Sequence, residues 1–104
     1  MEFIETFVFS KKSLLLLGDE GIWLLQKALI LYPLTGAVIP GSGGLRKMRW
    51  FSLGKGKKGG LRVIYYFVTS DNKIFLLYIY EKSKTEDLDL DFLKKLKLLV
   101  EENN

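Results

Sequence analysis

The chain has 104 residues, of which 48% are hydrophobic and 27% are charged, and its formal net charge is +4. This length and mixture fit one globular domain over residues 1–104 and exclude a fibrous or disordered chain. The sequence contains no cysteine and no histidine, which excludes disulfides, thiolate nucleophiles and the commonest metal ligands. Any catalysis must therefore use lysine, arginine, tyrosine, serine, threonine or carboxylate side chains.

The sequence predicts a cytoplasmic protein that does not associate with a membrane. No apolar run approaches the roughly 20 residues that a membrane-spanning helix needs. The first residues include Glu2 and Glu5, whereas a secretory signal begins with basic residues.

The N-terminal third predicts one strand and two helices. Aromatic and β-branched residues at 3–9 indicate a strand, and residues 10–17 indicate a short helix. A turn at 18–21 separates this helix from a second one at 22–32, which ends at a Tyr-Pro pair. The second helix is apolar almost all round, so we expect it to be buried, with Trp23 in the core.

The next strand is predicted at 45–51, where basic and apolar residues alternate. Alternate side chains of an extended segment share a face, so Lys47 and Arg49 point to one side of the sheet. Met48 and Trp50 then point to the other side, into the core.

Two further strands, at 61–69 and 74–80, flank a hairpin turn at 70–73. Both strands are apolar on both faces apart from Arg62, which is typical of central strands. A final helix is predicted over 87–102.

The N-cap of this final helix is Thr85 or Asp89, because both side chains can accept a hydrogen bond from the first helical turn. The order of elements is strand, two helices, three strands and a helix. It predicts an α+β fold with a small antiparallel sheet and helices packed on it.

Positive charge is concentrated in the middle of the chain. Residues 21–70 contain eight basic residues and no acidic one, whereas the segments before and after them each carry a net charge of −2. Like charges at this density repel one another, and phosphate groups would supply the missing counter-charge. The segregation favours a polyanionic partner over the alternative of a solubilising surface.

Two motifs are incomplete. Residues 54–59 match the G-x-G-x-x-G dinucleotide fingerprint, but a β-rich run follows them instead of the helix that the motif requires. Asp87, Asp89 and Asp91 have part of the spacing of a calcium loop, without its glycine or distal glutamate. We expect neither a cofactor nor a metal.

The basic residues suit RNA transesterification, a reaction that needs neither histidine nor metal. A 2′-hydroxyl attacks the adjacent phosphate, and the protein accepts that proton, stabilises the phosphoryl oxygens and protonates the leaving 5′-oxygen. Arginine and lysine stabilise the phosphoryl charge, and lysine can accept a proton where neighbouring cations disfavour its own charge. The same cations could also hold RNA without cutting it.

Three segments of the chain, at 44–49, 54–67 and 79–82, resemble the HigB branch of the RelE/ParE toxin superfamily. The resemblance is strongest over residues 39–90. It implies a RelE-like fold and the toxin of a type II toxin–antitoxin system, which cleaves mRNA in the ribosomal A site. Its partners would be the ribosome, mRNA and a small antitoxin, expected to be a helix-turn-helix protein.

The resemblance also implies roles for individual residues. Lys47 would accept the proton and Arg62 would stabilise the phosphate, while Arg49 and Lys82 would contact the phosphate or the leaving group. RNA binding would fall to Arg46, Lys55, Lys57, Lys58 and Lys84.

The sequence departs from the best-known members in its C-terminal part. Ser83 stands where those proteins have a second basic residue, and no tyrosine or histidine follows in residues 83–104. The general acid is therefore unassigned, and we expect poor activity without the ribosome to position the substrate. Two alternatives stay open: a ParE-like gyrase poison, and a non-catalytic RNA-binding or antitoxin-binding domain.

Overall fold

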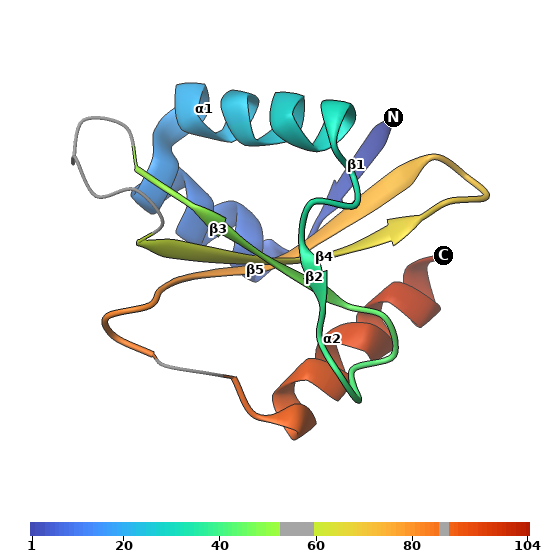
Figure 1. Ribbon diagram of the computed structural model, residues 1–104. Coiled ribbons are helices and arrows are strands. Elements are labelled where there is room, and N and C mark those ends of the chain that lie inside the picture. Colours follow the sequence, from blue (N-terminus) through green and yellow to red (C-terminus); the bar gives the residue numbers. More distant parts are fainter. Residues whose placement is uncertain (53–59, 86–87) are drawn as a thin grey trace.

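The computed structural model describes residues 1–52, 60–85 and 88–104. Within these ranges a five-stranded sheet lies between two helical layers, with most of α1 above the sheet and α2 below it in Figure 1. The elements in chain order are β1 (Glu2–Glu5), α1 (Phe7–Leu31), β2 (Ala37–Val38), β3 (Arg46–Trp50), β4 (Leu61–Val68), β5 (Lys73–Glu81) and α2 (Leu90–Asn103).

The predicted α+β fold is confirmed, but the sheet is mixed instead of wholly antiparallel. The strand order is β1-β5-β4-β3-β2, and the neighbours from β2 to β5 are antiparallel. β1 lies parallel to β5, with Phe3 opposite Ile74. Periodicity along a strand reports which residues share a face and not which strand lies beside it. The place of β1 and the two-residue strand β2 were therefore missed.

The predicted strand at 3–9 is wrong in its second half, because α1 begins at Phe7. The Thr6 hydroxyl accepts a hydrogen bond from the Phe9 N–H at 3.0 Å and donates one to the Leu77 carbonyl at 2.8 Å. This N-cap starts the helix and ties it to β5. Here the cap outweighs the strand preference of the aromatic residues that follow it.

The two predicted helices are segments of α1 that meet at Gly18. This residue has φ 71° and ψ 174°, outside the helical region. Side-chain-bearing residues rarely adopt a positive φ, so glycine suits this position. The break is narrower than the predicted turn, and the second segment ends at Tyr32, as the sequence predicts.

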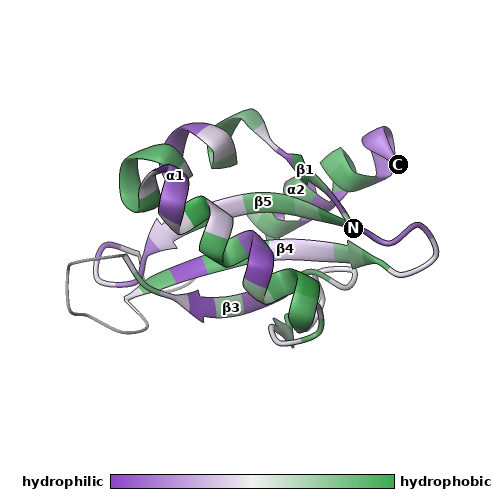
Figure 2. Cartoon of the chain, turned by 90° about the horizontal axis from the view of Figure 1, so that it is seen from above, coloured by the Kyte–Doolittle hydropathy of each residue, from purple (hydrophilic) through white to green (hydrophobic). Residues whose placement is uncertain are grey.

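The prediction that Trp23 belongs to the core is wrong. Its side chain is 57% exposed, and the Lys27 ammonium lies 5.0 Å from its ring centroid. Only one face of α1 meets the sheet, where Leu25 and Leu29 are fully buried. Figure 2 shows hydrophobic positions on the outward side of α1 as well. Apolar periodicity alone could not distinguish the two faces.

The C-terminal helix begins later than predicted, at Leu90. Of the two candidate caps, Asp89 is the one used, since its carboxylate accepts a hydrogen bond from the Phe92 N–H at 2.8 Å. Leu93 and Leu96 are buried against the sheet, as expected. No helix in the described ranges is long and apolar enough to cross a bilayer.

Each face of the sheet carries its own apolar cluster. On β4, Val63 and Tyr65 join the cluster under α1, whereas Ile64 joins the cluster under α2. The predicted alternation on β3 is confirmed, since Met48 is buried and Trp50 packs against the α1-side cluster. Lys47 and Arg49, which alternate with these two residues, therefore face the α2 side.

Candidate functional site

Three neighbouring strands place Arg49, Arg62 and Tyr80 in one row across the sheet. The Arg62 Cα pairs with that of Arg49 on β3 and with that of Tyr80 on β5. Side chains at directly opposed positions share a face, with their Cβ atoms about 5 Å apart. The row therefore brings two guanidinium groups and a phenol together on the α2 side.

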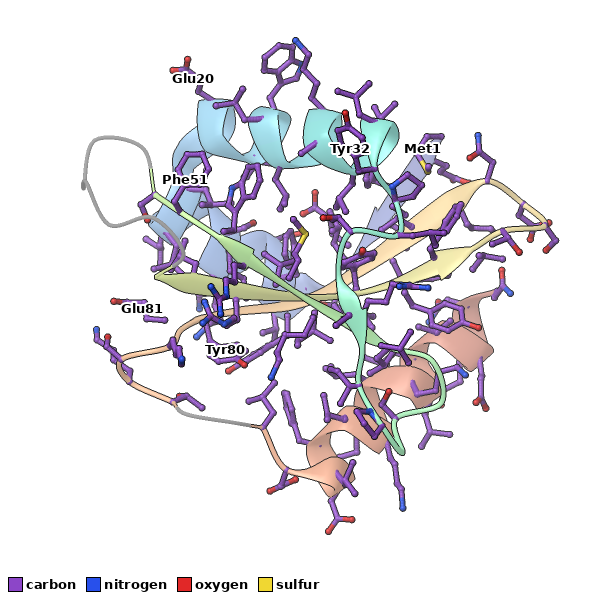
Figure 3. All side chains as sticks on the ribbon, in the orientation of Figure 1. Met1, Glu20, Tyr32, Phe51, Tyr80 and Glu81 are labelled. Atoms are coloured by element: carbon purple, nitrogen blue, oxygen red, sulfur yellow. The ribbon has the colours of Figure 1, made fainter. Side chains whose placement is uncertain are left out.

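Lys47 extends this row, because it lies two residues before Arg49 and on the same face. It lines a cleft of about 150 Å³ together with Tyr80 and Leu93. In Figure 3, Tyr80 lies on the α2 side of the sheet. We call Lys47, Arg49, Arg62 and Tyr80 the basic cluster.

Exposure within the basic cluster decreases from β3 through β4 to β5. Arg49 is exposed and Lys47 is half-buried, whereas Arg62 and Tyr80 are only 8% and 3% exposed. An incoming anion would therefore meet Arg49 first. The buried members lie deeper, where charge interactions are less screened by water.

Arg62 is a charged residue at a buried position of a central strand. Its Nη1 donates a hydrogen bond to the Leu61 carbonyl at 3.1 Å. In the described part of the chain, no buried side-chain nitrogen or oxygen lacks a hydrogen-bond partner. A buried guanidinium carries a desolvation cost that an apolar residue would avoid. A buried charge in a central strand makes Arg62 a candidate site residue.

Lys82 and Lys84 follow β5 and reach the same end of the sheet. The Lys82 N–H donates to the Gly60 carbonyl at 3.0 Å, which holds this segment beside the start of β4. The side chains of both lysines are exposed. Lys84 forms a surface ion pair with Glu81 at 3.3 Å, so part of its charge is already compensated.

Arg46 lies on the opposite face from the basic cluster. Its Nη1 donates hydrogen bonds to the carbonyls of Gly36, at 2.7 Å, and Leu34, at 3.4 Å. Tyr65 supports the same segment, because its hydroxyl accepts from the Gly36 N–H and donates to the Pro33 carbonyl, both at 2.8 Å. Burial raises the pKa of Tyr65, against smaller lowering effects from the Gly36 hydrogen bond and the Arg46 charge.

Among the described candidate residues, Arg46 is not brought into the basic cluster. Arg46 is held by backbone carbonyls on the α1 side, so its predicted contact with RNA stays a prediction. The three loop lysines lie outside the described residues: Lys55, Lys57 and Lys58.

Tyr80 is the member of the basic cluster to which the sequence analysis gave no role. Tyr80 belongs to a strand whose buried residues are all apolar or aromatic. No pattern in the sequence therefore distinguishes its hydroxyl as part of a site. The signal that identifies it is the pairing with Arg62, which exists only once the strands are assembled.

A second surface feature is an apolar groove of about 760 Å³ between α2 and the junction of β1 with α1. A single helix does not cover the α2 side of the sheet, and the strip over β1 and β5 stays open. Phe7, at the rim, is 81% exposed. Residues lining the groove include Ile4, Phe7, Phe75, Leu77, Phe92 and Leu99.

The basic cluster fits an anion better than a cation. Planar guanidinium groups donate two parallel hydrogen bonds to phosphate, and a lysine adds a point charge. Within residues 1–52, 60–85 and 88–104, no three acidic side chains come together in a group that could hold a metal ion. No model of a known protein family matches this chain.

Proposed function

We propose that this chain is a ribosome-dependent mRNA endoribonuclease, the toxin of a type II toxin–antitoxin system that acts in the cytoplasm. The observation that carries the proposal is the row of Arg49 and Arg62 beside Lys47, on one face of the sheet. The acid-free segment 21–70 and the resemblance to the HigB branch support it. The mixed α+β sheet with helices on both faces is compatible with that family's small fold.

The proposed reaction uses side chains alone. Lys47 accepts the proton of the 2′-hydroxyl as its oxygen attacks the adjacent phosphorus. Arg62 and Arg49 donate hydrogen bonds to the phosphoryl oxygens as their negative charge grows. The bond from phosphorus to the 5′-oxygen then breaks, and Lys82 lies at the same end of the sheet to contact the leaving group.

The size of the cleft supports dependence on the ribosome. Pockets that enclose a small ligand measure about 300–1,000 Å³, whereas the cleft at Lys47 and Tyr80 measures about 150 Å³. The cleft that these described residues form is therefore smaller than a typical nucleotide pocket. In the proposed reaction the ribosomal A site would position the substrate.

We also propose a small antitoxin as the partner that silences the protein. The apolar groove beside α2 supports a protein partner, because exposed apolar surfaces of this kind commonly mark interaction sites. A helical segment of the antitoxin would bury Phe7 and Leu99 there. Such binding could block entry into the ribosome without touching the basic cluster.

Primer extension on a defined mRNA, with and without translating ribosomes, tests this function. The proposal predicts cuts in register with codons that appear only when ribosomes are present. Cuts without ribosomes would indicate a free ribonuclease. If folded protein arrests growth and yields no cuts in either reaction, the alternative of a gyrase poison gains support.

A further inference from the structure

The proposed reaction needs a proton donor for the leaving 5′-oxygen, and the sequence assigns none. We propose that Tyr80 is the catalytic acid of this site and that its phenol donates this proton. The inference rests on the proposed function and adds a residue to it. It is carried by the position of Tyr80 in the basic cluster.

Tyr80 lies at the β5 end of the row, next to Arg62 on β4 and two strands away from Lys47 on β3. Its Cα pairs with that of Arg62, and its side chain shares the 150 Å³ cleft with Lys47. It also forms part of the wall of a second cleft of about 220 Å³, with Lys12 and Lys84. Although Tyr80 is only 3% exposed, both clefts reach it.

The surrounding charges suit a phenol that gives up a proton. Once the proton leaves, the phenolate lies on the same face of the sheet as Arg62, at the paired position of the adjacent strand, where opposite charges attract.

Every proton that moves in the proposed reaction is accepted and donated by the substrate, Lys47 or Tyr80. The 2′-oxygen forms its bond to phosphorus and loses its proton to Lys47, while the bond to the 5′-oxygen breaks and that oxygen takes the proton of Tyr80. The Lys47 ammonium then returns a proton to the Tyr80 phenolate, directly or through water in their shared cleft. Both side chains are restored, and no other reactant is consumed.

Tyr78 provides a matched control on the same strand and face. Its ring centroid lies 6.0 Å from that of Tyr80, but its Cα pairs with Ile64, not with an arginine. Its ring packs edge-on against Phe92, with centroids 5.0 Å apart, and the Lys12 ammonium lies 5.2 Å from its centroid. Tyr78→Phe therefore removes a neighbouring hydroxyl and leaves every residue of the basic cluster in place.

The test compares Tyr80→Phe and Tyr78→Phe on ribosomes programmed with two mRNAs. One mRNA has the natural 5′-oxygen at the cleaved bond, and the other has sulfur there, a leaving group that needs no proton. For the oxygen substrate, Tyr80→Phe is expected to lower the single-turnover rate about 10²–10⁴-fold. For the sulfur substrate the loss should shrink to a few-fold, and Tyr78→Phe should change neither rate.

Two results would overturn the assignment. An unchanged rate for Tyr80→Phe on the oxygen substrate shows that another group donates the proton. An equal loss on both substrates shows that the hydroxyl only maintains the structure. Wild-type protein that cleaves neither substrate overturns the proposed function itself, a different result from either of these.

A second variant keeps the hydroxyl, and so separates folding from proton transfer. Fluorinated tyrosine incorporated at position 80 has a more acidic phenol of nearly the same shape. The cleavage rate should then begin to fall at a lower pH than in the wild type, because the more acidic phenol loses its proton sooner as the pH rises. A fall that begins at the same pH as in the wild type would contradict the assignment.

Discussion

Arg49 and Arg62 lie directly opposite each other on β3 and β4, with both guanidinium groups on the α2 side of the sheet. Like charges at directly opposed strand positions destabilise a sheet. We therefore expect the two charges to destabilise the free protein and a bound phosphate to relieve their repulsion.

Arg49→Gln should stabilise the fold while weakening the site. Removing the exposed member of the pair should raise the unfolding free energy by about 0.2–1 kcal/mol, measured by urea denaturation. Ribosome-dependent cleavage should fall at least about tenfold. Lys27→Gln, which removes an exposed charge from α1, is the control and should change neither quantity. A destabilised Arg49→Gln protein would argue against repulsion in the row.

A short polyanion should stabilise the wild-type protein. Because a phosphate bound at the two arginines would offset the repulsion between them, an RNA oligonucleotide should raise the melting temperature, and added salt should reduce the effect. In Arg49→Gln the rise should be smaller than in the wild type. Equal rises in both proteins would show that the anion binds elsewhere.

Arg46 and Lys47 are adjacent on β3 but face opposite sides, which predicts opposite consequences of substitution. Arg46→Met removes the hydrogen bond to the Gly36 carbonyl and should cost about 1–3 kcal/mol of stability, with little effect on the cleavage rate of the folded fraction. Lys47→Met should abolish cleavage by protein that remains folded. The comparison needs urea denaturation and single-turnover rates for both variants.

Tyr65 should make the fold sensitive to alkali. Burial raises its pKa above that of tyrosine in the unfolded chain, so its contribution to stability is complete below about pH 10 and is lost as the pH rises through the folded-state pKa. Tyr65→Phe should cost about 1–3 kcal/mol at neutral pH, because the Gly36 N–H loses its acceptor.

The stability difference between wild type and Tyr65→Phe should then narrow above about pH 10. Urea denaturation of both proteins between pH 7 and pH 11 checks this. A difference that stays constant over the range would contradict the assigned pKa direction.

The sequence predicted the parts of the fold that depend on local pattern. Alternation on β3 assigned the faces of Lys47 and Met48. Asp89, the N-cap of α2, was one of the two candidate caps. The break at Gly18 was also expected, because glycine favours conformations that interrupt a helix.

The remainder depends on how separate segments pair, which no local pattern reports. The parallel placement of β1 beside β5 and the register that aligns Arg62 with Tyr80 are properties of the assembled sheet. The exposure of Trp23 has the same origin, since only one face of α1 meets the sheet. The basic cluster could therefore be predicted as a set of cations, whereas its phenol could not.

The most direct test of the basic cluster as an mRNA-cleaving site maps mRNA 5′ ends on translating ribosomes treated with the wild type, Arg62→Met or the surface control Lys27→Gln. The wild type and Lys27→Gln should produce the same codon-registered cuts, whereas Arg62→Met should lower the cleavage rate about 10²–10³-fold while remaining folded. Undiminished cleavage by folded Arg62→Met would contradict the account, because the buried guanidinium of the row would then have no part in the reaction.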